Sequence, residues 1–383
     1  MVEKKILFAA STRSHLVHFH LPYLRALREE GWTVHALYGG TQEEDLPQAE
    51  RTIFVPLKKS IAAPDNFRAA VQVRKLVRAE GYQAIIVHTA LAAFFVRLAL
   101  LGLKHRPTVI NMVHGYLFDH STNPLKRQLL LSAERLTAPV TDLLLTMNRE
   151  DLHLAQTHKL GRQIAFVPGV GVDFSRLDCD RATTRTAMRH RLSIPEDAFV
   201  LLYPAEFSSR KSQQVLLHAL TLLPANFMLV LPGTGALLEE CQVLAASLGL
   251  SEQVLFPGYV SDMGAWYAMA DCAVSASRSE GLPFNIMEAM HCTLPVVASQ
   301  VKGHCDLISH EQNGLLYPYG DRQACAHQLL RLAQNPNLAA ALARQAHEDV
   351  ARYALNAVFP QVMAAYHTAL GEPSAANKLP TAP

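Results

Sequence analysis

Two glutamates lie eight positions apart in the segment SRSEGLPFNIMEAM, residues 277–290. Glu280 falls in a glycine-containing turn after an apolar, strand-like run, and Glu288 falls one turn into the predicted helix that follows. Pro283 suits the first position of this helix because its missing N–H is not needed there. The amides and dipole of the first helical turn favour an anion by about 0.3–2 kcal/mol. Since the Glu288 carboxylate can accept two hydrogen bonds from a vicinal diol, the pattern fits a phosphate flanked by two hydroxylated groups, as in a nucleotide sugar.

Two glutamates at this spacing, without other motifs, are more often one acid in a turn and one exposed acid on a helix. The interpretation therefore depends on the secondary structure around them. Strand-like and helix-like segments alternate along the chain, beginning with KILFAAS (5–11), and a second series begins with FVLLYPAE (199–206). The strands are continuous apolar runs, which is typical of parallel strands covered on both faces. The chain is therefore predicted to be α/β, with two tandem Rossmann-like doubly wound domains, an interdomain cleft, and ligands beyond the carboxyl ends of the strands.

The predicted first domain covers residues 1–170 and the second covers residues 171–355. A charged segment, Asp178–Arg191, follows a stretch rich in proline and glycine and is predicted to be a low-order linker. A helix over residues 356–371 is expected to pack back on the first domain. Residues 372–383 are expected to form a loose tail.

Composition indicates a globular protein of a reducing compartment. Hydrophobic residues make up 50% of the 383 positions and charged residues 18%. The longest apolar run, residues 90–103, is interrupted by Arg97 and is too short to span a bilayer, and no secretory signal is recognised. The six cysteines have no CxxC or Cys/His metal spacing. We therefore expect a cytoplasmic protein without disulfides.

The two halves of the chain differ in charge. Residues 1–170 carry 21 lysine and arginine against 14 aspartate and glutamate residues, whereas the remainder carries 14 against 19. A basic first half suits a membrane surface or a phosphorylated substrate better than nucleic acid, because the basic residues are dispersed and no nucleic-acid motif accompanies them. An ordinary solvated surface accounts for the same charges equally well.

The segment EGLPFNIMEAMHCTLPVVAS, followed by GHCDLI and NGLLY, resembles glycosyltransferase family 4, the retaining transferases of the GT-B fold. The segments SHLVHFHLPYLRALREEGWTVHAL, MVHGYLFDHSTNPLKRQLLLSAERL and VPGVGVD are similar to the branch that builds bacterial capsule, exopolysaccharide, lipopolysaccharide and lipid-linked oligosaccharide chains. The resemblance covers nearly the whole chain.

The resemblance implies roles for particular residues of the donor site. Glu280 would contact the donor sugar near its C3 and C4 hydroxyls, Glu288 would hold the ribose hydroxyls, and His114 would lie near the reacting centre. The residues expected to line the sugar, the phosphates and the base are Gly281, Leu282, Pro283, Phe284, Gly233, Gly235, Gly258 and Tyr259.

One segment departs from the family pattern. Many members carry G-R-L-x-x-x-K-G, whose arginine and lysine clamp the diphosphate, but this chain has AEFSSRKS at 205–212. Lys211 keeps the lysine place, and Glu206 takes the arginine place, where a carboxylate would repel phosphate. We hypothesise that Arg210 or Lys211 supplies the positive charge and that Glu206 orients one of them.

The first strand–helix turn, AASTRSHL, also lacks the glycine-rich form. Ser14 and His15 are candidates to contact the acceptor or a phosphate there. His18 and His20, which follow in the predicted helix, are expected to be surface or packing residues.

The implied reaction moves a hexosyl or N-acetylhexosaminyl group from a nucleoside diphosphate sugar, with UDP as the family's usual carrier, to a saccharide acceptor such as a polyprenyl diphosphate oligosaccharide. Retention is expected by front-face attack with a diphosphate oxygen as base. No cofactor or metal is implied. The sequence DCD at 178–180 has the letters of the metal-binding D-x-D motif, but it falls in the presumed linker and is assigned no metal. The basic segment NPLKR is expected to rest on the anionic inner leaflet of the plasma membrane.

Three other functions are alternatives for a chain of this fold. A nucleotide-dependent oxidoreductase needs G-x-G-x-x-G after the first strand and an acid after the second, and the chain has neither. A nucleotide-sugar epimerase shares the fold. A catalytically silent nucleotide-sugar-binding partner of a polysaccharide assembly complex is favoured by one feature, the glutamate at position 206.

Overall fold

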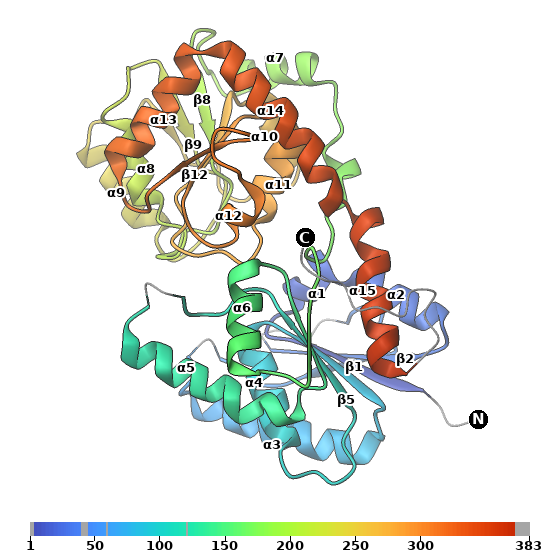
Figure 1. Cartoon of the computed structure of the whole chain (residues 1–383). Helices are drawn as coiled ribbons and strands as arrows, with labels where there is room; N and C mark the ends of the chain where they lie inside the picture. The colour runs from blue at the N-terminus through green and yellow to red at the C-terminus, as the bar shows by residue number, and fades with distance from the viewer. Residues whose placement is uncertain (1–3, 40–44, 59, 120–121, 372–383) are drawn as a thin grey trace. The chain divides into compact units, whose positions relative to one another are not determined.

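The computed structural model describes residues 4–39, 45–58, 60–119 and 122–371. The chain divides into unit 1, residues 1–171 with 356–383, and unit 2, residues 172–355 (Figure 1). Each unit contains one parallel sheet wound with helices, which confirms the two Rossmann-like α/β domains. The predicted tail, residues 372–383, lies outside the described residues. Within the described ranges, no helix is both long and apolar enough to cross a membrane.

The sheet of unit 1 has the strand order β3-β2-β1-β4-β5-β6-β7. The strands are β1 Lys5–Ala10, β2 Thr33–Tyr38, β3 Arg51–Phe54, β4 Ala84–His88, β5 Thr108–Val113, β6 Leu143–Thr146 and β7 Gln163–Phe166. β1 pairs with β2 on one side and with β4 on the other, with Ile6 opposite Val34 and Ala84. The strand order therefore reverses between β1 and β4, and such a switch point is where open α/β sheets bind ligands.

The helices of unit 1 are α1 Arg13–Phe19, α2 Leu21–Glu29, α3 Pro64–Glu80, α4 Ala90–Leu100, α5 Pro124–Thr137, η1 Ala138–Val140, α6 Arg149–His158 and α15 Leu355–Leu370. α15, orange-red in Figure 1, packs against the N-terminal part of the chain. The ring of Tyr23 in α2 lies 5.1 Å from Phe359, and Tyr366 packs edge-on against Phe8 of β1. Aromatic contacts thus fix the last helix on the first strand of unit 1.

The sheet of unit 2 has the order β10-β9-β8-β11-β12-β13. The strands are β8 Phe199–Leu202, β9 Phe227–Val230, β10 Val254–Leu255, β11 Cys272–Ser275, β12 Val296–Ser299 and β13 Leu315–Tyr317. Its strand order reverses between β8 and β11. The loops that follow these two strands contain Arg210, Lys211 and Glu280, so the fold brings the predicted charges to one switch point.

The helices of unit 2 are η2 Phe174–Leu177, α7 Arg181–Arg191, α8 Gln213–Leu220, α9 Leu238–Ser247, α10 Met263–Met269, α11 Phe284–His291, α12 His304–Leu307, α13 Arg322–Gln334, α14 Pro336–Val350 and η3 Ala351–Tyr353.

The prediction of a low-order linker over Asp178–Arg191 is wrong, because most of this segment forms helix α7. The Asp180 side chain caps the helix by accepting a hydrogen bond from the amide of its second residue. Arg185 and Arg189 each donate to the Asp271 carboxylate at 2.5 Å. The charges that suggested a solvated linker therefore dock α7 on the start of β11.

Candidate functional site

Helix α11 starts one residue later than predicted. Pro283 has φ −78° and ψ 119°, which makes it the N-cap, and Phe284 is the first helical residue. The preceding loop carries Glu280, whose side chain is 7% exposed, and the buried Leu282. The predicted turn and helix are therefore present, and Glu280 lies inside unit 2 rather than on its surface.

Glu280 binds two cations from the loop after β8. Arg210 Nη1 donates to Glu280 Oε2 at 2.7 Å, and Lys211 Nζ donates to Oε1 at 2.5 Å. Burial alone would raise the pKa of Glu280, but Lys211 and Arg210 outweigh it and lower that pKa to about 2. Burial lowers the pKa of Lys211, and its attraction to Glu280 opposes this. The result is one buried anion that holds two cations at the switch point of unit 2.

The hypothesis that Glu206 orients one of these cations gains no hydrogen bond in its support, although the Glu206 charge opposes the lowering of the pKa of Lys211. Both cations are bonded to Glu280, and across the described part of the chain no hydrogen bond of the Glu206 carboxylate is found. Glu206 is exposed, and its backbone carbonyl accepts a hydrogen bond from Gln213 Nε2 at 3.0 Å. The physical reason is burial: Glu280 lies between the two cations, whereas Glu206 faces solvent.

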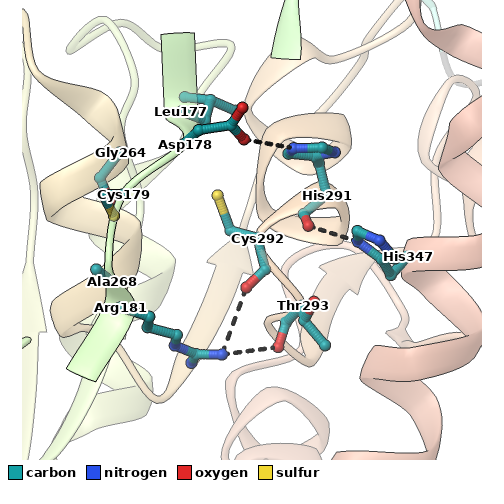
Figure 2. A pocket seen from close by; sticks show the side chains of 10 residues that line it. All are labelled: Leu177, Asp178, Cys179, Arg181, Gly264, Ala268, His291, Cys292, Thr293 and His347. Carbon is teal, nitrogen blue, oxygen red and sulfur yellow. Dashed lines mark hydrogen bonds and ion pairs between the residues drawn. The ribbon is translucent and has the colours of Figure 1, made fainter. Parts of the chain in front are cut away.

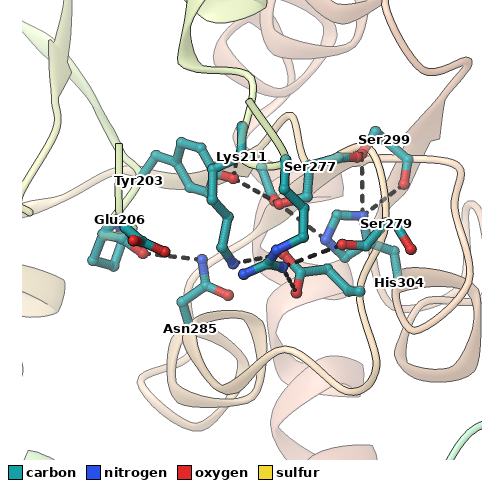
Figure 3. A network of polar contacts seen from close by, with 12 residues as sticks. Tyr203, Glu206, Lys211, Ser277, Ser279, Asn285, Ser299 and His304 are labelled. Carbon is teal, nitrogen blue, oxygen red and sulfur yellow. Dashed lines mark hydrogen bonds and ion pairs between the residues drawn. The ribbon is translucent and has the colours of Figure 1, made fainter. Parts of the chain in front are cut away.

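A network of polar side chains lies beside these charges (Figure 3). The Tyr203 hydroxyl donates to the backbone carbonyl of Lys211 at 3.0 Å and contacts Ser277 Oγ at 2.8 Å. His304 Nδ1 bonds the carbonyl of Ser299 at 2.7 Å, and burial lowers the pKa of His304 to about 4, so the ring is neutral at pH 7. The sequence interpretation gave no role to Tyr203 or His304, although the latter stands in the quoted segment GHCDLI.

Two of the predicted glycines, Gly233 and Gly235, pack too closely against backbone for a side chain. A Cβ at Gly233, where φ is +147°, would lie 2.0 Å from the carbonyl oxygen of Ala205. A Cβ at Gly235, where φ is +152°, would lie 2.4 Å from that of Phe207. The Gly233 amide also donates to the carbonyl of Gly258 at 2.8 Å. The loops after β8, β9 and β10 are therefore joined at their backbones, and the exposed Tyr259 stands beside this junction.

Glu288 has a separate environment one turn into α11. Its carboxylate accepts hydrogen bonds from Arg176 Nη2 and, at 2.9 Å, from the Tyr267 hydroxyl. Burial raises the pKa of Glu288, and Arg176 and Tyr267 oppose the shift. Because the Arg176 side chain is 49% exposed, a diol could reach Glu288 beside it or in its place. Sequence reasoning missed Arg176, which stands in the proline- and glycine-rich stretch that was interpreted as the approach to a linker.

Unit 1 carries a second polar centre at its own switch point. The predicted residues His15 and His114 are in contact, with their Nε2 atoms 3.4 Å apart. His20 Nε2 lies 3.3 Å from His15 Nε2, and His88 Nδ1 lies 3.2 Å from His114 Nε2. Burial lowers the pKa of all four rings, that of His15 to about 4, so they are neutral at pH 7. The expectation for His20 as a surface or packing residue missed its place in this cluster.

The neighbours of this cluster on α1 behave as ordinary helix residues. His18 is exposed, and its Nδ1 contacts the Ser14 carbonyl at 2.7 Å. Ser14 Oγ donates to Thr12 Oγ1 at 3.1 Å, and Thr12 caps the helix. The predicted candidate Ser14 is therefore part of a helix start next to the histidines, and its role toward an acceptor stays a prediction.

A cavity of about 350 Å³ lies at the other end of α11 (Figure 2). His347 Nδ1 bonds the carbonyl of His291 at 2.6 Å, and Arg181 Nη1 donates to the carbonyl of Thr293 at 3.3 Å. The two aspartates of DCD do not share a centre there, since Asp178 faces His291 at 3.6 Å and Asp180 caps α7. The polar groups of this cavity are thus occupied in holding α7, α11 and α14 together.

Comparison with known proteins agrees with this arrangement of two Rossmann-like units. The family model "Glycosyl transferase 4-like domain" matches residues 13–169, and "Glycosyl transferases group 1" matches residues 184–349. "Putative glycosyltransferase EpsD" of Bacillus subtilis (strain 168) is 32% identical over 91% of this chain and 93% of its own length. The chain therefore belongs to glycosyltransferase family 4, with the GT-B fold, and is a glycosyltransferase.

One further curated protein and one solved structure are similar to this chain. The "UDP-Gal:alpha-D-GlcNAc-diphosphoundecaprenol alpha-1,3-galactosyltransferase" of Escherichia coli is 22% identical over 77% of this chain and 78% of its own length. The crystal structure of Anabaena HepE in complex with UDP and glucose superposes with a TM-score of 0.78 at 20% identity, over 96% of this chain and all of that chain. At 20% identity, the similarity to HepE shows a shared fold only.

Proposed function

We propose that this glycosyltransferase moves a hexose or N-acetylhexosamine from a UDP-sugar to a saccharide acceptor on a lipid diphosphate, with retention at the anomeric carbon. The product would be part of a bacterial surface polysaccharide. The Escherichia coli relative supports the donor and acceptor classes by the substrates in its name, and HepE supports the donor through its bound UDP and glucose. Retention rests on family resemblance.

The convergence of Arg210 and Lys211 on Glu280 carries this proposal. As the bond to the anomeric carbon breaks, negative charge grows on the diphosphate. Two cations and the first turn of α11 provide fixed positive charge for it, so the donor step needs no metal ion. Glu280 would then serve a double purpose, because it positions both cations and offers its carboxylate to the sugar hydroxyls.

The remaining donor residues follow from the same placement. Glu288, held by Tyr267, would accept the ribose hydroxyls, and the loop that runs from Gly281 to Phe284 would line the sugar and phosphates. Gly258 and Tyr259, at the joined loops after β9 and β10, would contact the base. A diphosphate oxygen would take the proton of the attacking acceptor hydroxyl.

A catalytically silent nucleotide-sugar-binding protein is the second candidate, because Glu206 replaces the arginine found in many relatives. Such a protein would bind UDP-sugar at the same residues and release no product. A nucleotide-sugar epimerase would convert the donor without any acceptor. The three functions therefore differ in what becomes of a labelled sugar.

The test uses the full chain, a panel of labelled UDP-sugars and a short polyprenyl diphosphate saccharide, with and without EDTA. A lengthened lipid with a retained anomeric configuration, formed also in EDTA, is the expected result. Lys211→Ala should lower kcat by about 10²–10³-fold, which is typical of removing one stabilising donor. The exposed Arg191→Ala is the matched control. Donor binding without product would establish the silent protein, and full turnover by Lys211→Ala would refute the role of this cation.

We further propose that unit 1 rests on the cytoplasmic, anionic leaflet of the plasma membrane through helix α5. Leu125 and Leu129, one turn apart, are 83% and 67% exposed, and Lys126 and Arg127 stand between them. Each basic residue near an anionic surface contributes about 1 kcal/mol. Leucines exposed beside such charges can enter the interface.

Sedimentation with phosphatidylglycerol vesicles measures this directly. Binding should fall several-fold in high salt, on phosphatidylcholine vesicles, and in the Leu125→Ser, Leu129→Ser double variant. Leu222→Ser, an exposed leucine of unit 2, is the control. Equal binding by the wild type and the double variant would show that α5 is an ordinary solvated surface.

A further inference from the structure

The four-histidine cluster of unit 1 is built from three separate segments. His15 comes from α1 and His20 from the α1–α2 junction, whereas His88 ends β4 and His114 follows β5. β1, β4 and β5 are neighbours in the sheet, so the carboxyl ends of three adjacent strands meet at these rings. One ring nitrogen from each histidine lies within 4.8 Å of the others.

The spacing of the nitrogens matches a tetrahedral metal site. Zn²⁺ binds imidazole nitrogen at about 2.0–2.1 Å, so adjacent ligands of a tetrahedron stand about 3.3 Å apart. The three nitrogen–nitrogen contacts in the cluster measure 3.2, 3.3 and 3.4 Å. Closing the remaining nitrogen–nitrogen distances to the same value requires shifts of about 1.5 Å or less, together with separation of the His20 and His88 rings, whose centroids lie 3.7 Å apart.

Hydrogen bonding among the rings cannot account for all three contacts. A neutral imidazole nitrogen presents either one hydrogen or one lone pair in the ring plane. His15 Nε2 and His114 Nε2 each touch two other nitrogens, so each has one more neighbour than it can bond well. A single cation at the centre would accept a lone pair from every ring at once.

We propose that these four histidines bind one divalent transition-metal ion, with Zn²⁺ as the best match. Imidazole ligands suit Zn²⁺, Co²⁺, Ni²⁺ and Cu²⁺, whereas Mg²⁺ and Ca²⁺ require oxygen ligands. His15 and His114 are half-buried and provide a route to solvent, while His20 and His88 are fully buried. Four protein ligands complete the tetrahedron, which is the arrangement of a structural site.

The surroundings of the cluster set the expected affinity. His20 Nδ1 and His88 Nε2 are buried without a hydrogen-bond partner in the described part of the chain. Metal-binding histidines usually donate this second N–H to a fixed acceptor, and losing such a partner costs about 10–100-fold in affinity. The set also contains no carboxylate to offset the charge of the ion. The dissociation constant is therefore expected in the micromolar range.

This ion would have a different task from the cations of the donor site. Arg210 and Lys211 belong to unit 2, and the histidines belong to unit 1. The ion would join the strand ends of unit 1 and raise its stability, and its binding requires neither donor nor acceptor. The family resemblance implies that His114 lies near the reacting centre, so a metal ion bound to His114 would also affect glycosyl transfer. The metal-binding test does not depend on this effect.

The experiment titrates chelator-treated full-length protein with ZnCl₂ by calorimetry and with CoCl₂ by visible absorption. One ion per chain and a tetrahedral Co²⁺ spectrum are expected, with a rise in the melting temperature of unit 1 followed through Trp32 in a Trp266→Phe background. At 100 times the dissociation constant, the rise should be about 5–10 °C. His15→Ala and His114→Ala should each weaken binding by at least 10-fold and abolish the Co²⁺ bands. The matched control is His18→Ala, an exposed histidine of the same helix.

Circular dichroism shows whether each variant is folded, and the half-buried positions are chosen so that folding is retained. Absence of stoichiometric binding in the wild type at 1 mM Zn²⁺ would overturn the proposal. Unchanged binding in the folded His15→Ala and His114→Ala variants would overturn it too, because the ion would then sit on other histidines or cysteines. UDP affinity, measured on the same samples, tests the donor site separately.

Discussion

Replacing Glu280 by glutamine should weaken unit 2 by about 3 kcal/mol at pH 7. The pKa of Glu280 falls from 4.5 to about 2 on folding, mainly because Lys211 and Arg210 outweigh the cost of burial. A shift of this size corresponds to about 3 kcal/mol of folding free energy. Glutamine keeps the shape of the side chain but leaves the mostly buried Lys211 without its counter-charge, and breaking a buried pair costs a similar amount, about 3–5 kcal/mol.

The stability difference between the wild type and Glu280→Gln should depend on pH. A carboxyl whose pKa is lowered on folding stabilises the protein above its unfolded pKa and loses that effect as the pH falls through the folded value. The contribution of Glu280 is therefore complete at pH 7 and declines from about pH 4.5 to pH 2. At pH 3.5 about 1.4 kcal/mol of it is gone, so the gap between wild type and variant should narrow from about 3 to about 2 kcal/mol.

Urea unfolding of unit 2 can be followed through Trp266, which is buried in α10, in a Trp32→Phe background that removes the other tryptophan. Glu206→Gln is the control, and its unfolding free energy should stay within about 0.5 kcal/mol of the wild type because Glu206 is exposed. A Glu280→Gln protein as stable as the wild type at pH 7, or a gap that does not narrow in acid, would refute the reasoning.

Three further changes probe other parts of the molecule. Gly235→Ala should destabilise unit 2 by about 2–4 kcal/mol in the same urea assay, because the new Cβ would meet the backbone of the loop after β8; unchanged stability would contradict this packing. Glu134→Gln removes the counter-charge 2.8 Å from the fully buried Arg97 and should lower the unfolding free energy of unit 1 by about 3–5 kcal/mol, and a loss below 1 kcal/mol would count against it. Tyr267→Phe removes a hydrogen bond that opposes the raised pKa of Glu288, so UDP binding should weaken about 5–10-fold, with a larger loss at lower pH than at higher pH; a pH-independent loss would exclude this cause.

Local sequence signals predicted the elements of the donor site well. The apolar run before Glu280 forms the buried strand β11, the glycine marks the turn, and the proline stands at the start of α11. Continuous apolar strands indicated parallel sheets, and both sheets are parallel. These features follow from short stretches of chain, because strand burial, turn formation and helix initiation depend on neighbouring residues.

The partners of the charged side chains could not be predicted from neighbouring residues. The arginines of α7 suggested a solvated linker, yet Arg189 finds its partner Asp271 eighty-two positions along the chain. Glu206 stood in the place of a phosphate-binding arginine and suggested a partner for Lys211, but the actual partner is Glu280, sixty-nine positions away. An ionic side chain has many partners of opposite sign within the sequence, and burial selects one of them.

The chain's own order of residues was enough to determine that this is a two-unit α/β glycosyltransferase and which segment carries the donor-site acids. Only the tertiary structure decided that Glu280 holds both cations, that Arg176 bonds Glu288, and that His20 and His88 join His15 and His114. The histidines meet one another, and Glu280 meets its two cations, because the order of strands in each parallel sheet places the ends of β1, β4 and β5, or of β8 and β11, side by side. Arg176 reaches Glu288 because η2 packs on α11. That order depends on how whole sheets pack, and no local stretch of sequence records it.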